Sequence, residues 1–283
     1  VLRGGIARQL VSPLVLRSGT ALPAFATHEQ VTSLEALVYG KFRSDHDARF
    51  VLAAMSARFG TDHRVELISS ESGEQLVHWH ATPFDCQAPS GPCPLWRLGA
   101  VDLDGDEVDS VVAFRNDELV VFTETTAPQI AQQFDTGFNL FQATRGEVHA
   151  AMVGKPFSAD IDADGLEDVA VLGLGEVHIL WNDGSGELSM DRYTNVASAE
   201  PILAFAFLQT QGDDRLELAT VGAEGIELRT LDADHEFGAP LGIVDGPAGD
   251  ILVAGDFSGD GVDDMVVGDA LSFTLLFGES VEP

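Results

Sequence analysis

One nine-residue pattern of alternating acidic residues occurs three times in this chain and constrains its fold more than any other feature. It reads D-L-D-G-D-E-V-D-S at residues 102–110 (loop A), D-I-D-A-D-G-L-E-D at residues 160–168 (loop B) and D-F-S-G-D-G-V-D-D at residues 256–264 (loop C). Each copy leads directly into a run of apolar and β-branched residues that is typical of a strand. Because the copies share their spacing and their context, they indicate a structural repeat.

The alternation suits a loop around a hard divalent cation. Calcium takes roughly 6–8 oxygen ligands, and a tight loop can direct every second side chain inward while one backbone carbonyl fills a gap. Without a cation, such carboxylates would repel one another by about 1–4 kcal/mol per pair near a protein surface. A solvated turn can contain two or three Asp residues, but it gains nothing from the alternation. The pattern therefore predicts calcium sites.

The repeat register assigns ligands to each site. Side chains come from the first, third, fifth and ninth positions, and the seventh position supplies a carbonyl oxygen. Loop A has Ser110 at its ninth position and an acid one place off, at Asp109, so we expect two calcium sites in loops B and C and a less complete third in loop A. The expected ligands are Asp102, Asp104, Asp106, Val108 and Ser110 in loop A; Asp160, Asp162, Asp164, Leu166 and Asp168 in loop B; and Asp256, Ser258, Asp260, Val262 and Asp264 in loop C.

The residues that follow each loop separate it from two other calcium-binding motifs. An EF-hand carries a Glu at its twelfth position, whereas the twelfth positions here are Ala113, Val171 and Val267, all in strand-like runs. A dockerin-type loop continues into a helix, which β-branched residues disfavour. Over roughly residues 34–283, the chain instead resembles the FG-GAP/VCBS repeat of integrin-α-like β-propellers. In that family, one such loop per blade precedes the strand pattern seen here.

The repeat spacing predicts an all-β, five-bladed β-propeller with four-stranded antiparallel blades, which residues 1–283 form as a single domain. Loops start at residues 41, 102, 160, 209 and 256, and the repeats begin near residues 34, 96, 150, 202 and 251. The last repeat lacks a fourth strand. Because an open sheet edge invites aggregation, we expect an N-terminal strand at about residues 9–17 to complete the last blade. A ring that needs further copies from a longer chain is the alternative.

Strands are placed by apolar and β-branched runs between turn residues. Residues 124–147 are expected to hold an outer strand and an excursion whose Gln and Thr content permits a short helix, and another outer strand is expected to open at Leu188. The other expected strands are residues 34–42, 50–56, 64–69, 75–81, 96–101, 110–115, 118–123, 149–157, 168–173, 176–181, 202–208, 218–222, 226–230, 251–255, 265–268 and 271–277.

Two further loops, the first and the fourth in the chain, occupy the same position in the repeat but lack the full set of acidic ligands. In the first, cationic side chains cannot bind calcium, and we expect them to hold acidic turn residues internally. In the fourth, only two of the oxygen donors are carboxylates, so calcium affinity should be weak or absent. The cation positions are Lys41, Arg43, Asp45 and Arg49 in the first loop and Gln209, Gln211, Asp213 and Glu217 in the fourth.

The formal net charge of −31 argues against some classes of partner. Loops A, B and C hold 14 of the 46 Asp and Glu residues, so the rest of the chain still carries −17. Such a surface repels nucleic acid and anionic lipid, and solubility in a salty or calcium-rich medium explains it without a specific basic partner. No run of 18 apolar residues is present, so we expect no membrane insertion.

The two cysteines, Cys86 and Cys93, lie in the sequence C-Q-A-P-S-G-P-C. This spacing is compatible with a small disulfide-closed loop or with two free thiols, but not with a zinc site, which needs about four ligands. A disulfide would fit an oxidising compartment, where millimolar calcium is also found. Together with the resemblance, this predicts an extracellular protein, either secreted or at the cell surface.

No catalytic constellation is identified, so we do not expect an enzyme. The sequence has no G-x-S-x-G, H-E-x-x-H, Walker or dinucleotide-binding glycine motif. His78 and His80 would share one strand face, but a transition-metal site needs a third ligand, so we interpret them as surface or packing residues. Trp79, Trp96 and Trp181 could stack on sugars, although buried packing is the favoured interpretation.

The family resemblance implies an extracellular module for adhesion or recognition, stabilised by structural calcium. Its protein or carbohydrate ligand would bind at the rim loops or across one face of the ring. The alternatives are a lectin-like carbohydrate-binding propeller and the accessory domain of a larger secreted enzyme. A lectin should show aromatic-lined pockets between blades, whereas an enzyme should show one deep pocket with converging titratable groups.

Overall fold

The computed structural model describes residues 31–42, 52–59, 62–69, 75–79, 97–115, 118–123, 130–137, 156–210, 215–244, 249–269 and 271–278. These residues form strands, turns and loops, and no helix. In this part of the chain, accordingly, no helix has the length and apolar character that a membrane crossing needs. Cys86, Cys93 and the expected strand at residues 9–17 lie outside the described residues.

The strands of the described residues form five antiparallel sheets in which successive strands are neighbours; four of these sheets have four strands and the last has three. The first sheet contains β1 (Val31–Gly40), β2 (Leu52–Phe59), β3 (Asp62–Ser69) and β4 (Gln75–Trp79). The second contains β5 (Arg97–Val101), β6 (Ser110–Arg115), β7 (Glu118–Phe122) and β8 (Ile130–Asp135). The third contains β9 (Phe157–Ala159), β10 (Asp168–Gly173), β11 (Glu176–Leu180) and β12 (Tyr193–Val196). The fourth contains β13 (Ala204–Leu208), β14 (Glu217–Gly222), β15 (Gly225–Arg229) and β16 (Gly242–Val244), and the fifth contains β17 (Ile251–Gly255), β18 (Asp264–Gly268) and β19 (Phe273–Leu276).

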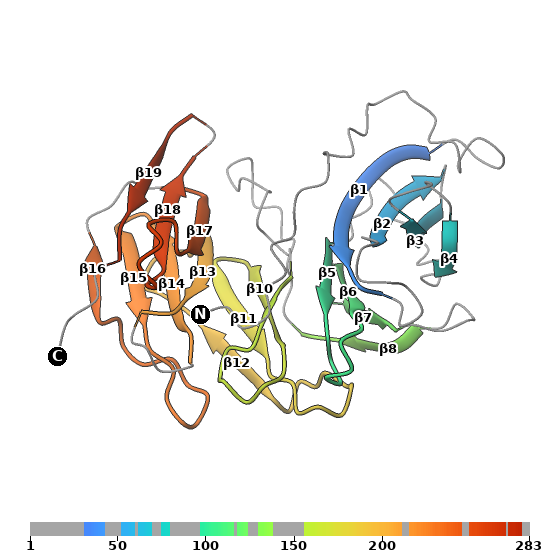
Figure 1. Ribbon diagram of the computed structural model, residues 1–283, viewed down its shortest axis with the longest axis horizontal. Coiled ribbons are helices and arrows are strands. Elements are labelled where there is room, and N and C mark those ends of the chain that lie inside the picture. Colours follow the sequence, from blue (N-terminus) through green and yellow to red (C-terminus); the bar gives the residue numbers. More distant parts are fainter. Residues whose placement is uncertain are drawn as a thin grey trace.

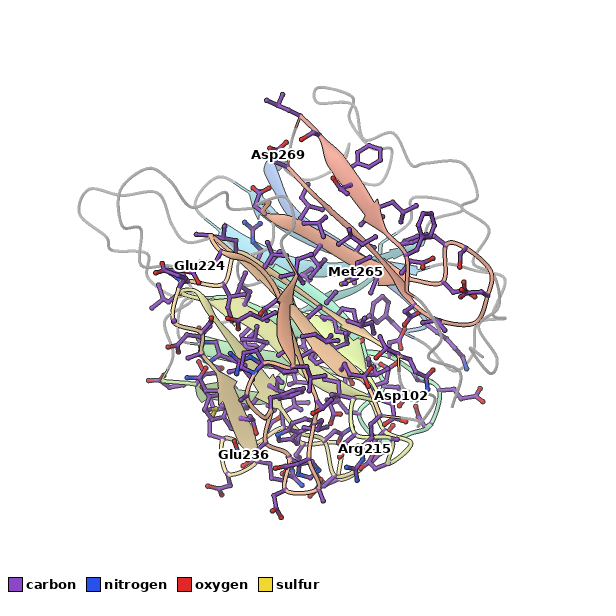
Figure 2. All side chains as sticks on the ribbon, turned by 90° about the vertical axis from the view of Figure 1, so that its left-hand side faces the viewer. Asp102, Arg215, Glu224, Glu236, Met265 and Asp269 are labelled. Carbon is purple, nitrogen blue, oxygen red and sulfur yellow. The ribbon has the colours of Figure 1, made fainter. Side chains whose placement is uncertain are left out.

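The sheets follow one another along an arc, with β1–β4 at one end and β17–β19 at the other (Figure 1). First strands of neighbouring sheets lie against each other, as for β1 and β5, β5 and β9, and β13 and β17. Loops A, B and C each connect the first strand of a sheet to its second, whereas tight turns connect the second to the third. In Figure 2, Asp102 of loop A and Glu224 of the β14–β15 turn accordingly lie on opposite sides of the molecule.

The sheets pack face to face, and β10 shows how the sequence encodes this. Val169 and Val171 pack in the core shared with the second sheet, and Ala170 and Leu172 pack in the core shared with the fourth. Successive side chains of a strand point to opposite faces, so both faces of β10 are covered and all its residues are buried. A strand buried on both faces reads as a continuous apolar run. Each fully buried Val or Leu contributes roughly 1.5–3 kcal/mol.

The expected all-β, antiparallel fold is confirmed, and residues 110–115, 168–173 and 251–255 form β6, β10 and β17 as predicted. The outer strand expected to open at Leu188 was placed wrongly, because β12 begins at Tyr193. The Leu188 side chain is buried between the second and third sheets. Its backbone N–H donates to the side-chain oxygen of Gln132 (3.0 Å), and its carbonyl accepts from the Gln132 amide. Leu188 therefore holds the connection between β11 and β12 in place by its buried apolar side chain, and this apolar residue was mistaken for the start of a strand.

The excursion expected at residues 124–147 is described only in part. Within it, β8 is the outer strand of the second sheet, and the rest of the excursion beyond Gly137 and before Ile130 lies outside the described residues. The described part of this stretch contains no helix.

The fifth sheet has one covered and one exposed apolar face. Leu252 and Val267 are buried in the core shared with the fourth sheet. The strand register shows which residues share the opposite face. Ile251 pairs with Gly268, which pairs with Phe273. Val253 pairs with Val266, which pairs with Leu275. The exposed apolar side chains on or next to that face are Ile251, Val253, Phe273, Leu275 and Phe277.

Candidate cation-binding loops

Loops A, B and C adopt the same turn, which contains two residues with left-handed backbone conformation, at the fourth and sixth positions. Glycine adopts this conformation readily, but loop A uses Glu107 (φ 64°) and loop B uses Ala163 (φ 66°). Holding a non-glycine residue there costs on the order of 1–3 kcal/mol, so the rest of the loop must impose the turn. The residues are Gly105 and Glu107, Ala163 and Gly165, and Gly259 and Gly261.

The turn brings together the acids at the first, third and fifth positions of loops A and B. In each of these loops, one carboxylate oxygen from each of the three residues lies within 4.8 Å of the other two. Loop C has Ser258 at its third position and therefore only two acids at these places. The converging acids are Asp102, Asp104 and Asp106 in loop A and Asp160, Asp162 and Asp164 in loop B.

The seventh position orients the fifth-position acid in all three loops. In loop B, the backbone N–H of Leu166 donates to Asp164 Oδ1 (2.8 Å). The same bond joins Val108 to Asp106 (2.8 Å) in loop A and Val262 to Asp260 (2.9 Å) in loop C. The repeated bond shows that the seventh-position N–H holds the fifth-position acid in each loop. The seventh-position carbonyl stays a predicted ligand.

One carboxylate oxygen of loop B lacks a partner. Asp160 Oδ2 accepts a hydrogen bond from the Gly165 N–H (3.1 Å), whereas the buried Asp160 Oδ1 finds no hydrogen-bond partner among the described residues. Burial raises the pKa of Asp160 above its ordinary value, and the nearby Asp164 and Asp162 carboxylates raise it further. Burying a carboxylate oxygen is costly unless it is hydrogen bonded, paired with a positive charge or coordinated to a metal. Loop B therefore fits a hard cation.

The ninth-position acids have a role that the cation-loop register does not predict, because each ties its loop to the sheet. Asp168 is fully buried; its Oδ2 accepts from the Ile161 N–H (3.1 Å) and its Oδ1 from the Asn182 N–H (2.9 Å). Burial raises the pKa of Asp168 to about 7, with Asp162 and Asp164 adding to the effect. The equivalent Ser110 in loop A is also buried.

In loop C, Asp264 makes the matching contacts. Its Oδ2 accepts from the N–H groups of Phe257 (2.9 Å) and Ser258 (2.7 Å), and its Oδ1 accepts from the Gly278 N–H (2.9 Å). Although desolvation raises the pKa of Asp264, these hydrogen bonds outweigh it and hold the pKa below its ordinary value. The first-position Asp256 accepts from the N–H groups of three loop residues, which are Gly259 (2.6 Å), Asp260 (3.1 Å) and Gly261 (3.0 Å).

Sequence reasoning missed the eighth position, which joins neighbouring sheets. Asp109 accepts from the Lys41 N–H (2.6 Å) and donates its own N–H to the Lys41 carbonyl (2.7 Å). Asp263 pairs in the same way with Gln209, accepting at 2.8 Å and donating at 3.3 Å. In both pairs, the eighth residue of one loop holds the first residue of the loop in the preceding sheet. We call this contact the carboxylate clasp.

Glu167, the eighth residue of loop B, makes the corresponding contact with the first residue of loop A. Its Oε2 accepts from the Asp102 N–H (3.1 Å). Burial raises the pKa of Glu167, which the Asp102 bond partly offsets. The fourth loop has Leu216 at this position, and its N–H donates to the Ile161 carbonyl instead (3.0 Å). The signal in the sequence was an acid at the eighth position of all three acidic loops.

The two loops with altered chemistry are described only in part. Lys41 Nζ lies 3.5 Å from Glu107 Oε2, so this cation contacts an acid of loop A. The acids of its own turn lie outside the described residues, and the expected internal pairing stays a prediction. Glu217 is buried and its Oε2 accepts from the Thr210 N–H (2.9 Å), as ninth-position acids do elsewhere. Arg43, Asp45, Arg49, Gln211 and Asp213 lie outside the described residues.

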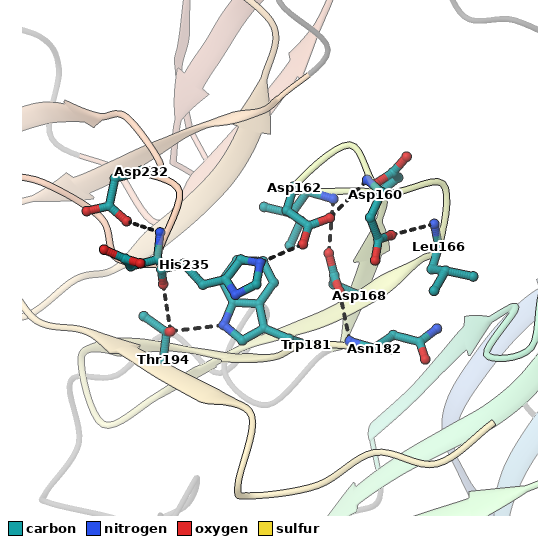
Figure 3. A network of polar contacts seen from close by, with 12 residues as sticks. Asp160, Asp162, Leu166, Asp168, Trp181, Asn182, Thr194, Asp232 and His235 are labelled. Carbon is teal, nitrogen blue, oxygen red and sulfur yellow. Dashed lines mark hydrogen bonds and ion pairs between the residues drawn. The ribbon is translucent and has the colours of Figure 1, made fainter. Parts of the chain in front are cut away.

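A hairpin of the fourth sheet reaches loop B. His235, in the connection after β15, lies 2.8 Å from Asp162 Oδ2 through its Nε2. Its ring stacks on Trp181, with ring centroids 4.7 Å apart. The Trp181 Nε1–H donates to Thr194 Oγ1 (2.9 Å), and the Thr194 hydroxyl donates to the His235 carbonyl (2.8 Å; Figure 3). Trp181 is buried, as expected for a packing residue. The side chains of His78 and Trp79 are not described, and His80 and Trp96 lie outside the described residues.

A hollow at the junction of the third and fourth sheets differs from the pocket expected of a lectin. Its lining combines acids with small and aliphatic residues, and Glu227 there accepts from Ser198 (3.0 Å) and Arg229 (2.8 Å). The lining residues are Ser198, Ala199, Glu200, Ile202, Thr220, Gly222, Glu224, Gly225 and Glu227. None is aromatic, so this hollow offers no stacking platform for a sugar ring.

Comparison with known proteins identifies a fold but no family. No protein-family model matches the chain, and a search of curated proteins finds no match. A solved Agrocybe aegerita lectin that recognises non-reducing terminal N-acetylglucosamine is 12% identical, with a TM-score of 0.52, over 87% of this chain and 67% of the lectin chain. BBS1N, crystallised in complex with ARL6DN, is 11% identical, with a TM-score of 0.51; the match covers 83% of this chain and 62% of BBS1N. This likeness shows a β-propeller-like fold.

Proposed function

We propose that this chain is an extracellular β-propeller module that is stabilised by calcium and recognises a protein or glycan ligand. Loop B carries the proposal, because three carboxylates converge there and a buried oxygen of Asp160 has no hydrogen-bond partner among the residues that the structure describes. The recognition half has weaker support from the similar folds, since BBS1N was crystallised with a protein and the lectin recognises a sugar. Extracellular calcium is abundant enough to fill sites of modest affinity.

The residues of each loop would divide the work of holding the ion. The first and fifth positions supply carboxylates in all three loops, and the third supplies a carboxylate in loops A and B and the Ser258 hydroxyl in loop C. The seventh position supplies a carbonyl. The ninth adds a carboxylate in loops B and C, where it also ties the loop to the sheet, and the Ser110 hydroxyl in loop A. Bound calcium supplies positive charge that offsets the repulsion among these acids. The proposed ligand sets remain Asp102, Asp104, Asp106, Val108 and Ser110; Asp160, Asp162, Asp164, Leu166 and Asp168; and Asp256, Ser258, Asp260, Val262 and Asp264.

We also propose that the five sheets are the blades of a ring that residues 9–17 close as the fourth strand of the fifth sheet. The three-stranded fifth sheet and its exposed apolar side chains support this closure. The first loop has Ala48 at its eighth position, so closure would depend on strand pairing rather than on a carboxylate clasp. Deletion of residues 1–30 should lower the melting temperature, and an unchanged temperature would reject this closure.

A calcium titration followed by thermal melting tests the metal half of the proposal. A cation that binds only the folded state at about 100 times its dissociation constant stabilises that state by roughly 2.7 kcal/mol per site. We therefore expect chelator to lower the melting temperature and calcium to restore it. Asp164→Asn should remove much of this response, whereas Asp191→Asn, at an exposed acid outside the loops, should retain it. A melting temperature that does not change with calcium concentration would refute the metal assignment.

A binding screen tests the recognition half. The calcium-loaded chain is applied to a glycan array and, in parallel, used as bait for extracellular proteins. Signal on the array supports a lectin-like propeller, and a silent array with saturable protein binding supports adhesion. We do not propose an enzyme. If the chain binds neither glycans nor extracellular proteins but is found in one polypeptide with a secreted catalytic domain, an accessory domain fits instead.

A further inference from the structure

Loops A and B belong to neighbouring sheets and are joined at their cation-binding positions. Glu167 of loop B accepts a hydrogen bond from the backbone N–H of Asp102 (3.1 Å), the first residue of loop A. Glu167 lies between Leu166 and Asp168, which are both expected ligands of loop B. The segment that would hold one ion therefore also positions the residue that would begin to hold the other.

Asn182 forms a second bridge between the same loops. Its side-chain amide donates to the carbonyl of Leu103 in loop A (3.0 Å) and to the carbonyl of Glu167 in loop B (3.1 Å). Its backbone N–H donates to Asp168 Oδ1 (2.9 Å; Figure 3), and its side-chain oxygen accepts from the Gly184 N–H (3.0 Å). Asn182 is buried, and both ends of its side-chain amide are hydrogen bonded.

We propose that loops A and B are coupled cation sites, so that an ion in either loop raises the affinity of the other. The inference rests on the proposed calcium binding. An ion in loop B orders Glu167 and the region around Asn182, and these residues then hold Asp102 and Leu103 in place. Loop A consequently loses less conformational freedom when it binds its own ion, which is a source of positive cooperativity. Thermodynamic linkage makes the effect reciprocal.

Charge works against this coupling but does not cancel it. Each loop contains five acids, so a loop that has taken up one divalent cation still has a formal charge of −3 and continues to attract the second ion. The first ion weakens that attraction, but salt screens charges over about 8 Å at physiological ionic strength. Hydrogen-bonded coupling should therefore persist at raised salt, where the opposing charge effect fades.

Loop C provides an internal reference. Its clasp residue Asp263 holds Gln209 (2.8 Å), the first residue of the loop that we expect to bind calcium weakly or not at all. We therefore expect no second calcium site in the fourth loop for loop C to be coupled to.

Isothermal titration with calcium tests the coupling in the full chain. An Asp260→Asn background silences loop C, and Asp164→Asn or Asp104→Asn then leaves only loop A or only loop B. Each remaining loop should bind about fivefold or more weakly than when both are intact, by the same factor in both directions. Glu167→Ala should reduce this difference and leave the part carried by the Asn182 bridge, and Glu167→Gln, whose amide oxygen can still accept from Asp102, should restore most of the loss.

The outcomes separate the two proposals. If each loop binds calcium equally well with and without the other, the coupling is refuted while the calcium sites stand. If coupling is undiminished in Glu167→Ala and the chain has native circular dichroism, the route through Glu167 is refuted. If the unmodified chain binds no calcium, the proposed function fails and the coupling fails with it. Should Glu167→Ala not fold, the Asp104→Asn and Asp164→Asn titrations still decide whether the loops are coupled.

Discussion

Loops B and C share a sequence pattern and a turn but differ in their surroundings. Loop B is contacted by the neighbouring sheets on both sides, through Glu167 toward loop A and through His235 from the fourth sheet. Residues 256–261 of loop C are exposed, and its first acid is satisfied by the loop's own N–H groups. A local pattern can thus specify a turn while the neighbouring sheets decide how much its acids need a cation.

The ninth-position acids show the electrostatic side of this difference. Asp168 and Asp264 are both fully buried and both accept backbone hydrogen bonds. The pKa of Asp168 nevertheless rises to about 7, because desolvation and the converging acids of loop B outweigh its two hydrogen bonds. The pKa of Asp264 falls below its ordinary value, because hydrogen bonds from Gly278, Ser258 and Phe257 outweigh desolvation.

The largest expected effect comes from removing each ninth-position acid. Asp168→Ala leaves two buried N–H groups without an acceptor, and each such group costs about 1–3 kcal/mol. We expect its free energy of unfolding, measured in urea, to fall by roughly 2–6 kcal/mol. Asp264→Ala should have a smaller effect, because its donors are partly exposed and can bond to water instead. A larger loss for Asp264→Ala would break the comparison.

The next effect is a pH dependence of opposite sign in the two loops when chelator is present. Between pH 3.8 and about 7, folded Asp168 holds a proton that the unfolded chain releases, so stability should fall as pH rises through this range. Asp264 has a lowered pKa, so its contribution should be lost as pH falls below about 4. Melting temperatures of the native chain, Asp168→Asn and Asp264→Asn measure both slopes, and each variant should reduce the slope in its own range only.

The smallest effect is the difference between the two calcium responses. Asp164 and Asp260 occupy the same position and accept the same seventh-position hydrogen bond (2.8 and 2.9 Å), so Asp164→Asn and Asp260→Asn form a matched pair. We expect Asp164→Asn to remove more of the calcium-dependent stabilisation, by about 1.4 kcal/mol for a tenfold difference in affinity. Equal losses in calorimetry would show that local sequence alone sets affinity.

Features that depend on a few neighbouring residues could be predicted from the sequence. The alternation of acids places the first, third and fifth carboxylates of loop B together, as expected. The run after loop B forms β10 at the expected residues. In both cases the relevant spacing lies within one turn or one strand, where backbone geometry leaves few alternatives.

Features that join distant segments could not be predicted. Leu188 looked like the start of a strand because its side chain is apolar, but its backbone partner is Gln132, which lies 56 residues earlier. Asp109 looked like a displaced ligand, yet it holds Lys41, 68 residues away. The sequence contains the acids but not the information about which face of which sheet they meet.

The sequence by itself determined that the chain forms repeated strands joined by acid-rich turns, because hydrophobic runs and alternating acids act over fewer than ten residues. Only the tertiary structure decided which acids are free to meet a cation and which hold the sheets together. The physical reason is that burial and hydrogen-bond partners come from neighbouring sheets. Within the described part of the chain, they leave an oxygen of Asp160 without a hydrogen-bond partner and commit Asp109 to Lys41.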